Sequence, residues 1–451
     1  MMKPSKTTRT TTDNGGPNAG SPRRGAVPPR ATFRDVFAVR EFRALWFSEV
    51  LSVAGDRLAL VALTLLVFQH TGSSLYTAMT YAAGYVPWVI GGLFLADVAD
   101  RRSRRSVMVA CDVVRAVLIA AMAVPGVPLG ALVALLFAAT MFAPPFESAR
   151  AAITPDILQG ERYALGTAVI QTTFLAGQTV GAVGGGFAVA FIGVRPALVI
   201  DAATFVLSGL VIGLAVRSRP APASLEGVQS SPLARMRDGF GLLFKDRALR
   251  TLLLLGWLVA FYTIPEGVAA PYAARLGGGP IATGLVLAST VFSTTIVTPL
   301  FTRLVRPRRR LAYMGPLAVL TCATLVLTAL RPNLAASLVI FSLSAACGVY
   351  QLAANTAFVV RVPNERRAQA FGIANMGVIV GQGAAFIAAG AAADAFSPAV
   401  VIAVGGGIGA VIGLILTLRW RHVSPPGGRH AASRRPGHAA ARSWAPLRGS
   451  S

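Results

Sequence analysis

The sequence predicts an all-α membrane protein with twelve transmembrane helices in two pseudo-symmetric six-helix bundles. Of its 451 residues, 54% are hydrophobic and only 13% are charged, which leaves too few polar side chains to cover a soluble protein of this size. The apolar residues form twelve continuous runs, and each is close to the roughly 20 residues with which a helix crosses a bilayer. Because these runs do not alternate with polar residues, a β-barrel is excluded.

The placement of the basic residues predicts the orientation. Alternate loops and the two tails hold 37 of the 42 Lys and Arg, the opposite loops hold only Arg195, Arg275 and Arg331, and the runs hold Arg57 and Arg115. Basic segments are retained in the cytosol during insertion. Both termini are therefore predicted to be cytosolic, and the Arg-, Ala- and Gly-rich composition favours the plasma (inner) membrane of a bacterium. The net charge of +24 is then explained by topology and contact with anionic lipid, so no nucleic acid is expected as a partner.

The predicted spans follow the apolar runs in order. They are 44–68, 75–96, 106–124, 129–149, 166–192, 196–216, 251–273, 281–302, 312–330, 335–359, 370–393 and 398–418. The first six spans form an N-terminal bundle over 41–217, and the last six form a C-terminal bundle over 250–420. Residues 1–40 and 421–451 are polar, basic and rich in Gly and Pro, which predicts disordered cytosolic tails, and the first tail has no apolar region of the kind that signal peptides contain.

The longest inner loop, 218–249, is predicted to link the two bundles. Its apolar residues recur at helical spacing with basic residues between them, which indicates an amphipathic helix on the inner leaflet. These residues are Leu233, Met236, Phe240, Leu243 and Phe244.

The two halves resemble each other. Similar sequences open spans 5 and 11 at Gly166 and Gly372, an offset of 206, and similar pairs close spans 2 and 8 at Leu93 and Leu300, an offset of 207. Two parallel repeats predict a substrate site at the interface between them.

A short motif follows span 2. The sequence Gly-Gly-Leu-Phe-Leu-Ala-Asp-Val-Ala-Asp-Arg-Arg over 91–102 resembles the loop 2–3 signature of the major facilitator superfamily. Over residues 40–420 the chain is similar to the drug/macrolide/siderophore exporter branch of that superfamily. The resemblance implies the major facilitator fold, a monomer, and an inner gate formed by Gly92, Asp97, Arg101 and Arg102. Leu93 and Val98 stand where the family pattern has Gly and Arg.

Span 5 contains closely spaced glycines at Gly177, Gly181, Gly185 and Gly186. They resemble the antiporter signature of the superfamily, although Ala182 stands where that signature has proline. Paired small residues allow helices to approach closely, and ordinary helix packing is the alternative interpretation.

Ionisable residues within the spans are candidates for proton coupling, because charge inside a bilayer is costly and usually functional. Asp56 in span 1 and Glu266 in span 7 are predicted proton or cation carriers, and Glu49 lies on the same helix face as Asp56. Arg57 points about 100° away from Asp56 and is expected to pair elsewhere. In span 3, Asp112 and Arg115 share a face. A static ion pair that locks helices together is the alternative for these residues and is favoured for Asp112 with Arg115.

Two further acids, Glu147 and Asp201, lie nearer the ends of their spans and are predicted to be structural. Aromatic side chains are candidates for the substrate cavity, with interfacial belts and packing as the alternative for most of them. The candidates are Tyr81, Tyr85, Trp257, Phe261, Tyr262 and Tyr350.

No catalytic residues, metal ligands or cofactor are expected. The sequence contains no GxxxxGK[ST] phosphate loop, no HExxH motif and no nucleophile–base arrangement, and Cys111, Cys322 and Cys347 are isolated. The predicted function is a secondary transporter that exports amphipathic small molecules by alternating access, in exchange for protons. A metabolite importer or facilitator, and a non-transporting membrane sensor, are the alternatives.

Overall fold

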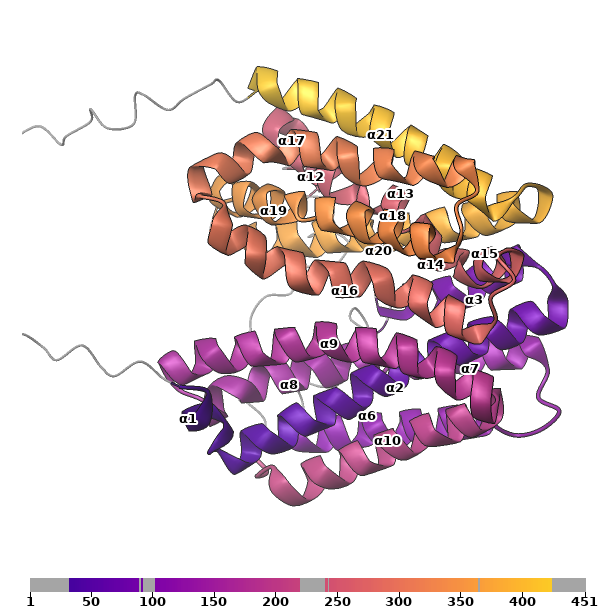
Figure 1. The fold of residues 1–451 in the computed structure, drawn as a ribbon. Helices are drawn as coiled ribbons and strands as arrows, with labels where there is room; N and C mark the ends of the chain where they lie inside the picture. The colour runs from indigo at the N-terminus through magenta and orange to yellow at the C-terminus, as the bar shows by residue number, and fades with distance from the viewer. Residues whose placement is uncertain are drawn as a thin grey trace, which may run out of the picture.

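The computed structural model describes residues 32–88, 91, 102–219, 240–241, 243–363 and 366–423, and this part of the chain is helical with no strand. Helix α1 and the end of α21 lie at the same end of the molecule (Figure 1). We call this end the terminal face and the opposite end the distal face. Successive spans run between the two faces in alternate directions.

The first half of the molecule contains the helices drawn in indigo and magenta in Figure 1. They are α1 (Phe33–Phe37), α2 (Arg40–Thr71), α3 (Ser74–Ala83), α6 (Arg104–Met122), α7 (Leu129–Thr140), α8 (Ala143–Ile157), α9 (Glu161–Ile192) and α10 (Val194–Ala215).

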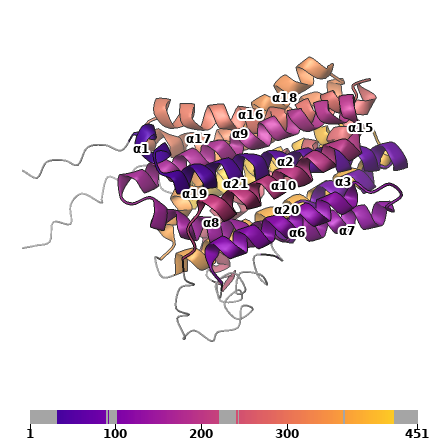
Figure 2. The same ribbon diagram turned by 90° about the horizontal axis from the view of Figure 1, so that it is seen from below.

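The second half, in orange and yellow, lies beside the first, and the view turned by 90° shows the long helices of both halves running roughly parallel (Figures 1 and 2). Its helices are α12 (Arg247–Trp257), α13 (Val259–Tyr262), α14 (Ile264–Gly267), α15 (Ala269–Arg275), α16 (Pro280–Leu304), α17 (Pro307–Ala323), the 3₁₀ helix η1 (Thr324–Leu330), α18 (Leu334–Cys347), α19 (Tyr350–Arg361), α20 (Arg367–Ala395) and α21 (Pro398–Val423).

Ten helical runs in the described residues are long and apolar enough to cross a membrane. The predicted span 106–124 forms α6, which carries Arg104, Arg105, Asp112 and Arg115 and is not among these ten runs. The predicted span 75–96 begins as α3 and is described through residue 88. The predicted all-α architecture of two pseudo-symmetric bundles is confirmed.

Several spans are interrupted where the sequence analysis predicted continuous helices. Proline lacks an amide hydrogen and clashes with the preceding turn. Pro144 and Pro145 start α8 within span 4, and Pro265 starts α14 within span 7. Span 10 changes helix at Gly348 and Val349, and span 9 tightens into η1. The proline that interrupts span 7, Pro265, directly precedes Glu266, a candidate coupling residue.

The first described residues correct one prediction. Residues 33–37 form α1 within the segment 1–40 that was predicted to be a disordered tail. Thr32 and Asp35 form a capping box, in which the Thr32 amide donates to Asp35 at 2.9 Å, an arrangement that stabilises a helix start. Val36 is buried against Phe42, Leu158 and Ile170, so α1 is held on the terminal face. Helix α21 likewise continues to Val423, beyond the predicted end of span 12.

The other predictions about the tails and the linker concern mainly residues 1–31, 220–239 and 424–451, which lie outside the described residues. Of the predicted amphipathic helix, Leu243 is described and buried against the second half. The rings of Phe240 and Phe244 stack with their centroids 6.0 Å apart.

The two halves contact each other closely in the part of the molecule toward the distal face. A Cβ atom added to Gly186 of α9 would lie 2.6 Å from the Pro280 carbonyl oxygen and 3.1 Å from the Gly284 Cα atom of α16. A Cβ added to Gly390 of α20 would likewise lie 2.5 Å from that of Ala78 on α3. Small residues thus let the backbones of the two halves touch.

A carboxylate also links the two halves at this distal contact. Asp394, at the end of α20, accepts hydrogen bonds from the Ser73 hydroxyl at 2.8 Å, the Ser74 amide at 2.5 Å and the Leu75 amide at 3.3 Å. These amides belong to the first turn of α3, where a negative charge interacts favourably with the helix dipole. Asp394 therefore holds the distal ends of the two halves together.

We expect Gly186→Ala to destabilise this closed arrangement, because the added methyl group has no space unless α9 and α16 separate. Overpacking of this kind costs about 1–3 kcal/mol. The midpoint of thermal unfolding of the purified protein should fall. Gly184→Ala is the matched control, since a Cβ there has no atom within 4 Å. Equal midpoints for the two variants would show that this glycine contact does not limit helix approach.

We also expect Asp394→Asn to open the distal face more often. Loss of the charge at the start of α3 costs about 0.3–1 kcal/mol, which corresponds to roughly a 2- to 5-fold rise in the open population. The measurement is labelling of Thr77→Cys, a buried position of α3 where cysteine is no larger than the native residue, by a membrane-impermeant thiol reagent in a background without Cys111, Cys322 and Cys347. Ser73→Ala, which removes only one of the three bonds, should have a smaller effect. Labelling of Asp394→Asn at the parent rate would contradict this role.

Candidate functional site

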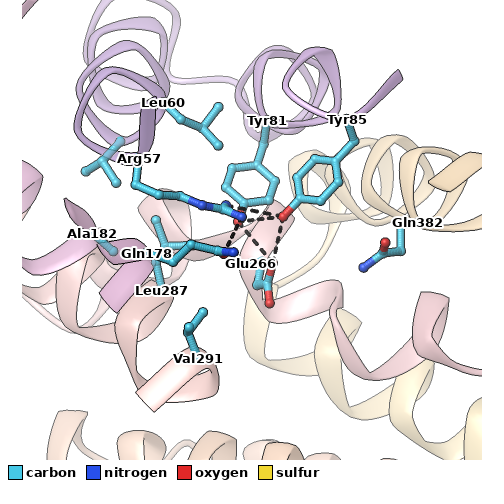
Figure 3. A pocket seen from close by; sticks show the side chains of 11 residues that line it. Arg57, Leu60, Tyr81, Tyr85, Gln178, Ala182, Glu266, Leu287, Val291 and Gln382 are labelled. Carbon is cyan, nitrogen blue, oxygen red and sulfur yellow. Dashed lines mark hydrogen bonds between the residues drawn. The ribbon is translucent and has the colours of Figure 1, made fainter. Parts of the chain in front are cut away.

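A polar network lies between the halves near the middle of the spans. Glu266 accepts hydrogen bonds from the Tyr81 hydroxyl at 3.0 Å and the Tyr85 hydroxyl at 3.3 Å (Figure 3). It also accepts one from the Thr290 hydroxyl at 3.3 Å. The tyrosines belong to the first half, whereas Glu266 and Thr290 belong to the second. The Glu266 carboxylate therefore joins the two halves at the point where a carrier would have to separate them.

Arg57 of α2 supplies a cation to the same network. It donates to the Gln178 side-chain oxygen of α9 at 2.5 Å and to the Tyr85 hydroxyl at 3.4 Å, and its guanidinium carbon lies 5.9 Å from the centroid of the Tyr85 ring. The Tyr85 hydroxyl therefore bridges the guanidinium of Arg57 and the carboxylate of Glu266 (Figure 3). Neutral hydroxyl and amide groups connect two opposite charges, so each charge can change partners without leaving the network.

Three cavities meet at this network. The central cavity, of about 120 Å³, is lined by Arg57, Glu266 and Gln178 among others. A first side cavity of about 380 Å³ lies between the first half and α20 and shares Arg57 and Gln178 with the central one. A second side cavity of about 390 Å³ lies between α9 and the second half and shares Glu266 and Gln178. Gln178 thus lines all three cavities.

Both side cavities extend from the centre toward the terminal face. The second one reaches Thr298 of α16 and Asn355 of α19, which lie nearest the terminal ends of those helices among its lining residues. The first one reaches Trp88 and Ala143. Since the distal parts of the halves are in close contact, the cavities are placed for access from the terminal face.

Asp56 and Arg115 lie in the wall of the first side cavity. They form an ion pair in which the Asp56 side chain is 42% exposed and that of Arg115 only 3%. Arg115 was expected to pair with Asp112, but Asp112 instead accepts a hydrogen bond from Ser208 at 2.6 Å. The prediction that Arg57 and Asp56 point to different partners is confirmed by these contacts.

Glu49 lies apart from the cavities. It is fully buried, with the Arg150 Nε atom 3.4 Å from its carboxylate, and Arg150 also pairs with Glu147. The arginine thereby connects α2 to α8. Glu49 thus lies in an ion cluster inside the first half, away from the cavity wall that Asp56 forms.

The six aromatic candidates divide into two groups. Tyr81, Tyr85 and Tyr262 line the cavities. Trp257, Phe261 and Tyr350 pack instead with the hydrophobic cluster of the second half. Tyr350 is fully buried and donates to the Leu255 carbonyl at 2.8 Å, and Trp257 donates to the Ala374 carbonyl at 3.1 Å. The periodicity of a span shows which residues share a face, but not whether that face meets a cavity or another helix.

The glycines of span 5 divide in a similar way. A Cβ at Gly177, Gly181 or Gly185 would contact α2, whereas Gly186 faces α16. Of the predicted inner gate, Gly92, Asp97 and Arg101 lie outside the described residues, and Arg102 is exposed.

The sequence analysis did not predict two of the residues that line the central cavity. Gln178 and Gln382 line the central cavity and are 8% and 9% exposed. Each follows a glycine in an apolar span, at Gly177 and Gly381. A single amide in such a run is itself a signal, because polar side chains within spans face the protein interior.

Helical spans in two similar halves, with charged cavities between them at mid-span, define a membrane carrier. The comparison with known families agrees. The profile of the Major Facilitator Superfamily matches residues 45–360, so the chain belongs to the Major Facilitator Superfamily. As a member of this superfamily the chain is classed with transporters and not with enzymes.

Similar proteins are transporters too. The chain is 28% identical over 183 residues to the uncharacterized MFS-type transporter YkuC of Bacillus subtilis, covering 40% of this chain and 42% of that one. It is 26% identical over 235 residues to the multidrug efflux pump Tap of Mycolicibacterium fortuitum, covering 50% and 58%. The chain thus spans about half the length of these relatives.

A solved structure of a POT family transporter in complex with 5-aminolevulinic acid is similar with a TM-score of 0.69 and 12% identity, over 88% of this chain and 99% of that one. At this identity the likeness shows the fold.

We expect Arg57→Met to destabilise the central network, because Gln178 loses its partner and Glu266 loses the nearest cation of the network. Hydrogen bonds to charged groups contribute about 1.5–3 kcal/mol each. Thermal unfolding of the purified protein would measure the loss. Arg57→Lys should recover part of it, since lysine keeps the charge but not the planar donor geometry. Equal stability of Arg57→Met and the unaltered protein would contradict the network.

Proposed function

We propose that this protein exports amphipathic small molecules across the bacterial plasma membrane by alternating access, in exchange for protons. The observation that carries the proposal is the position of Glu266. This carboxylate bonds to both halves and lines the cavities in the middle of the membrane. A group placed there changes its surroundings whenever the halves move, which is what coupling requires.

The lining of the side cavities supports an amphipathic substrate. Phe174, Trp88 and Val378 supply apolar and aromatic surface to the first, and Leu175, Val349 and Leu352 supply apolar surface to the second. Asp56, Arg57 and Glu266 supply charge close to this surface. A molecule with an apolar body and a polar or charged group fits such a combination.

The cavities extend toward the terminal face, which the distribution of basic residues assigns to the cytosol, and an exporter and an importer share such a state during alternating access. Export is supported by one comparison. The relative Tap is a multidrug efflux pump. We take the protein to be a multi-pass monomer in the lipid bilayer with both termini in the cytosol.

Proton exchange is assigned to Glu266 and Asp56. A protonated Glu266 is neutral and no longer attracts Arg57 across the bridging Tyr85 hydroxyl, whereas an ionised one attracts Arg57 or a cationic group of the substrate. Asp56 has the same choice between Arg115 and a ligand in the first side cavity. Binding of the proton and of the substrate therefore compete for the same carboxylates.

The experiment is efflux of fluorescent and antibiotic compounds from cells that express the protein, with and without a protonophore. We expect efflux that the protonophore abolishes, and its loss to the background rate in Glu266→Gln and Asp56→Asn. Exchange of labelled for unlabelled substrate across vesicles should also fall in Glu266→Gln, because the neutral amide imitates the protonated acid, which does not attract a cationic group of the substrate. Asp156→Asn is the control, since its pairing with Arg104 is exposed at the terminal face and exposed ion pairs contribute little.

Each alternative predicts a different result. Efflux that survives in both variants would remove the assignment of coupling to these carboxylates. Net accumulation inside the cells would identify an importer. A sensor would give no flux of any compound in either direction.

A further inference from the structure

Acidic side chains outnumber basic ones in a buried cluster behind Asp56. Asp112 of α6 and Asp201 of α10 are both fully buried, and Arg115 is 3% exposed. With Asp56, this cluster contains three carboxyl groups and one guanidinium. If all were ionised, two negative charges would be uncompensated inside the first half.

The contacts of Arg115 show which acid it neutralises. One terminal nitrogen pairs with Asp56, the other donates to the Ser52 hydroxyl at 3.2 Å, and the guanidinium carbon lies 4.1 Å from the centroid of the Phe205 ring. Its Nε atom is buried with no hydrogen-bond partner. Arg115 is therefore committed to Asp56 but keeps an unused donor inside the cluster.

Asp112 and Asp201 have neutral partners. Asp112 accepts from Ser208, whose hydroxyl lies 2.5 Å from that of Ser48, and Asp201 interacts with the Thr204 hydroxyl at 3.3 Å. One oxygen of each acid, Oδ1 of Asp112 and Oδ2 of Asp201, is buried with no partner. An ionised carboxylate is very costly in such a place, whereas a protonated one is tolerated.

Other charges nearby do not balance the cluster. Arg150 of α8 is held by Glu49 and Glu147, and Arg57 is bonded to Gln178 and Tyr85. Arg104 and Arg105 precede Asp112 on α6 by about two turns and are bonded to Asp156 and to the Gly213 carbonyl. Among the described residues, Arg115 is thus the basic side chain whose charge interacts with both Asp112 and Asp201.

We propose that Asp112 and Asp201 form a proton-binding site behind the cavity wall, and that Arg115 connects it to the cavity by exchanging between Asp56 and one of these acids. The proposal deepens the proposed proton exchange and rests on it for its role in transport. Asp201, which was predicted to be structural, becomes a positioning and proton-binding residue.

The exchange balances charge and protons. When a cationic group of the substrate binds Asp56 in the cavity, Arg115 is released and its guanidinium pairs with Asp112 or Asp201. That acid loses its proton to the water of the cavity. The positive charge of Arg115 therefore moves to the buried acid as one proton leaves it. In the reverse direction, proton uptake returns Arg115 to Asp56 and displaces the substrate. Asp201 also packs against Gly55, where a Cβ would lie 2.6 Å from the Thr204 hydroxyl, so Asp201 is in contact with the turn of α2 that carries Asp56.

The test is infrared spectroscopy of the full-length protein in lipid at neutral pH. A protonated carboxylic acid has a carbonyl stretching band that a carboxylate lacks, and ¹³C-labelled aspartate shifts the band of aspartic but not of glutamic acids. We expect shifted intensity from two aspartic acids in the unaltered protein, with one lost in Asp112→Asn and one in Asp201→Asn. Absence of any aspartic acid band would overturn the site without requiring a variant that folds.

Asp56→Asn tests the exchange itself. Asp56 forms the ion pair with Arg115, so its removal subtracts no carboxylic acid band directly. We expect it nevertheless to remove the intensity of one aspartic acid, because the freed Arg115 ionises Asp112 or Asp201. Asp156→Asn is the control and should change nothing. Unchanged intensity in Asp56→Asn would overturn the exchange, and this readout is independent of whether the protein exports or imports its substrate.

Discussion

The cost of charge in an apolar surrounding governs the interior of this protein. Water is excluded between packed spans, so every ionisable side chain there needs a partner, a proton or a cavity. The structure uses all three. Arg150 is shared by two acids, Glu266 is surrounded by hydroxyl groups, and Asp56 combines an arginine with exposure to a cavity.

The same constraint explains why the two halves join through neutral groups at their centre. A direct and desolvated ion pair between Arg57 and Glu266 would hold the halves together strongly, since breaking a buried pair costs several kcal/mol. The bridging hydroxyl of Tyr85 and the amide of Gln178 satisfy both charges with weaker bonds. Separation of the halves then requires only exchange of hydrogen bonds, which suits a carrier that must move in each cycle.

The distal contact is built differently. It combines close backbone approach at Gly186 and Gly390 with the charged cap that Asp394 gives to α3. Close packing and a cap at the membrane surface are rigid but individually modest in energy. The closed end can therefore be stable in one state and still open when binding at the centre favours the other state.

The sequence by itself determined the spans, their alternate directions, the two related halves and the identity of the ionisable residues in the membrane, because length, hydrophobicity and charge act locally along the chain. It also determined that Arg57 and Asp56 diverge, since the helical repeat fixes directions on one helix. Only the tertiary structure decided that Arg115 pairs with Asp56 and not Asp112, that Tyr350 packs in a core while Tyr85 lines a cavity, and that Gln178 is central. Helical periodicity gives the direction of a side chain, but the neighbour it meets is decided by how helices distant in sequence pack together.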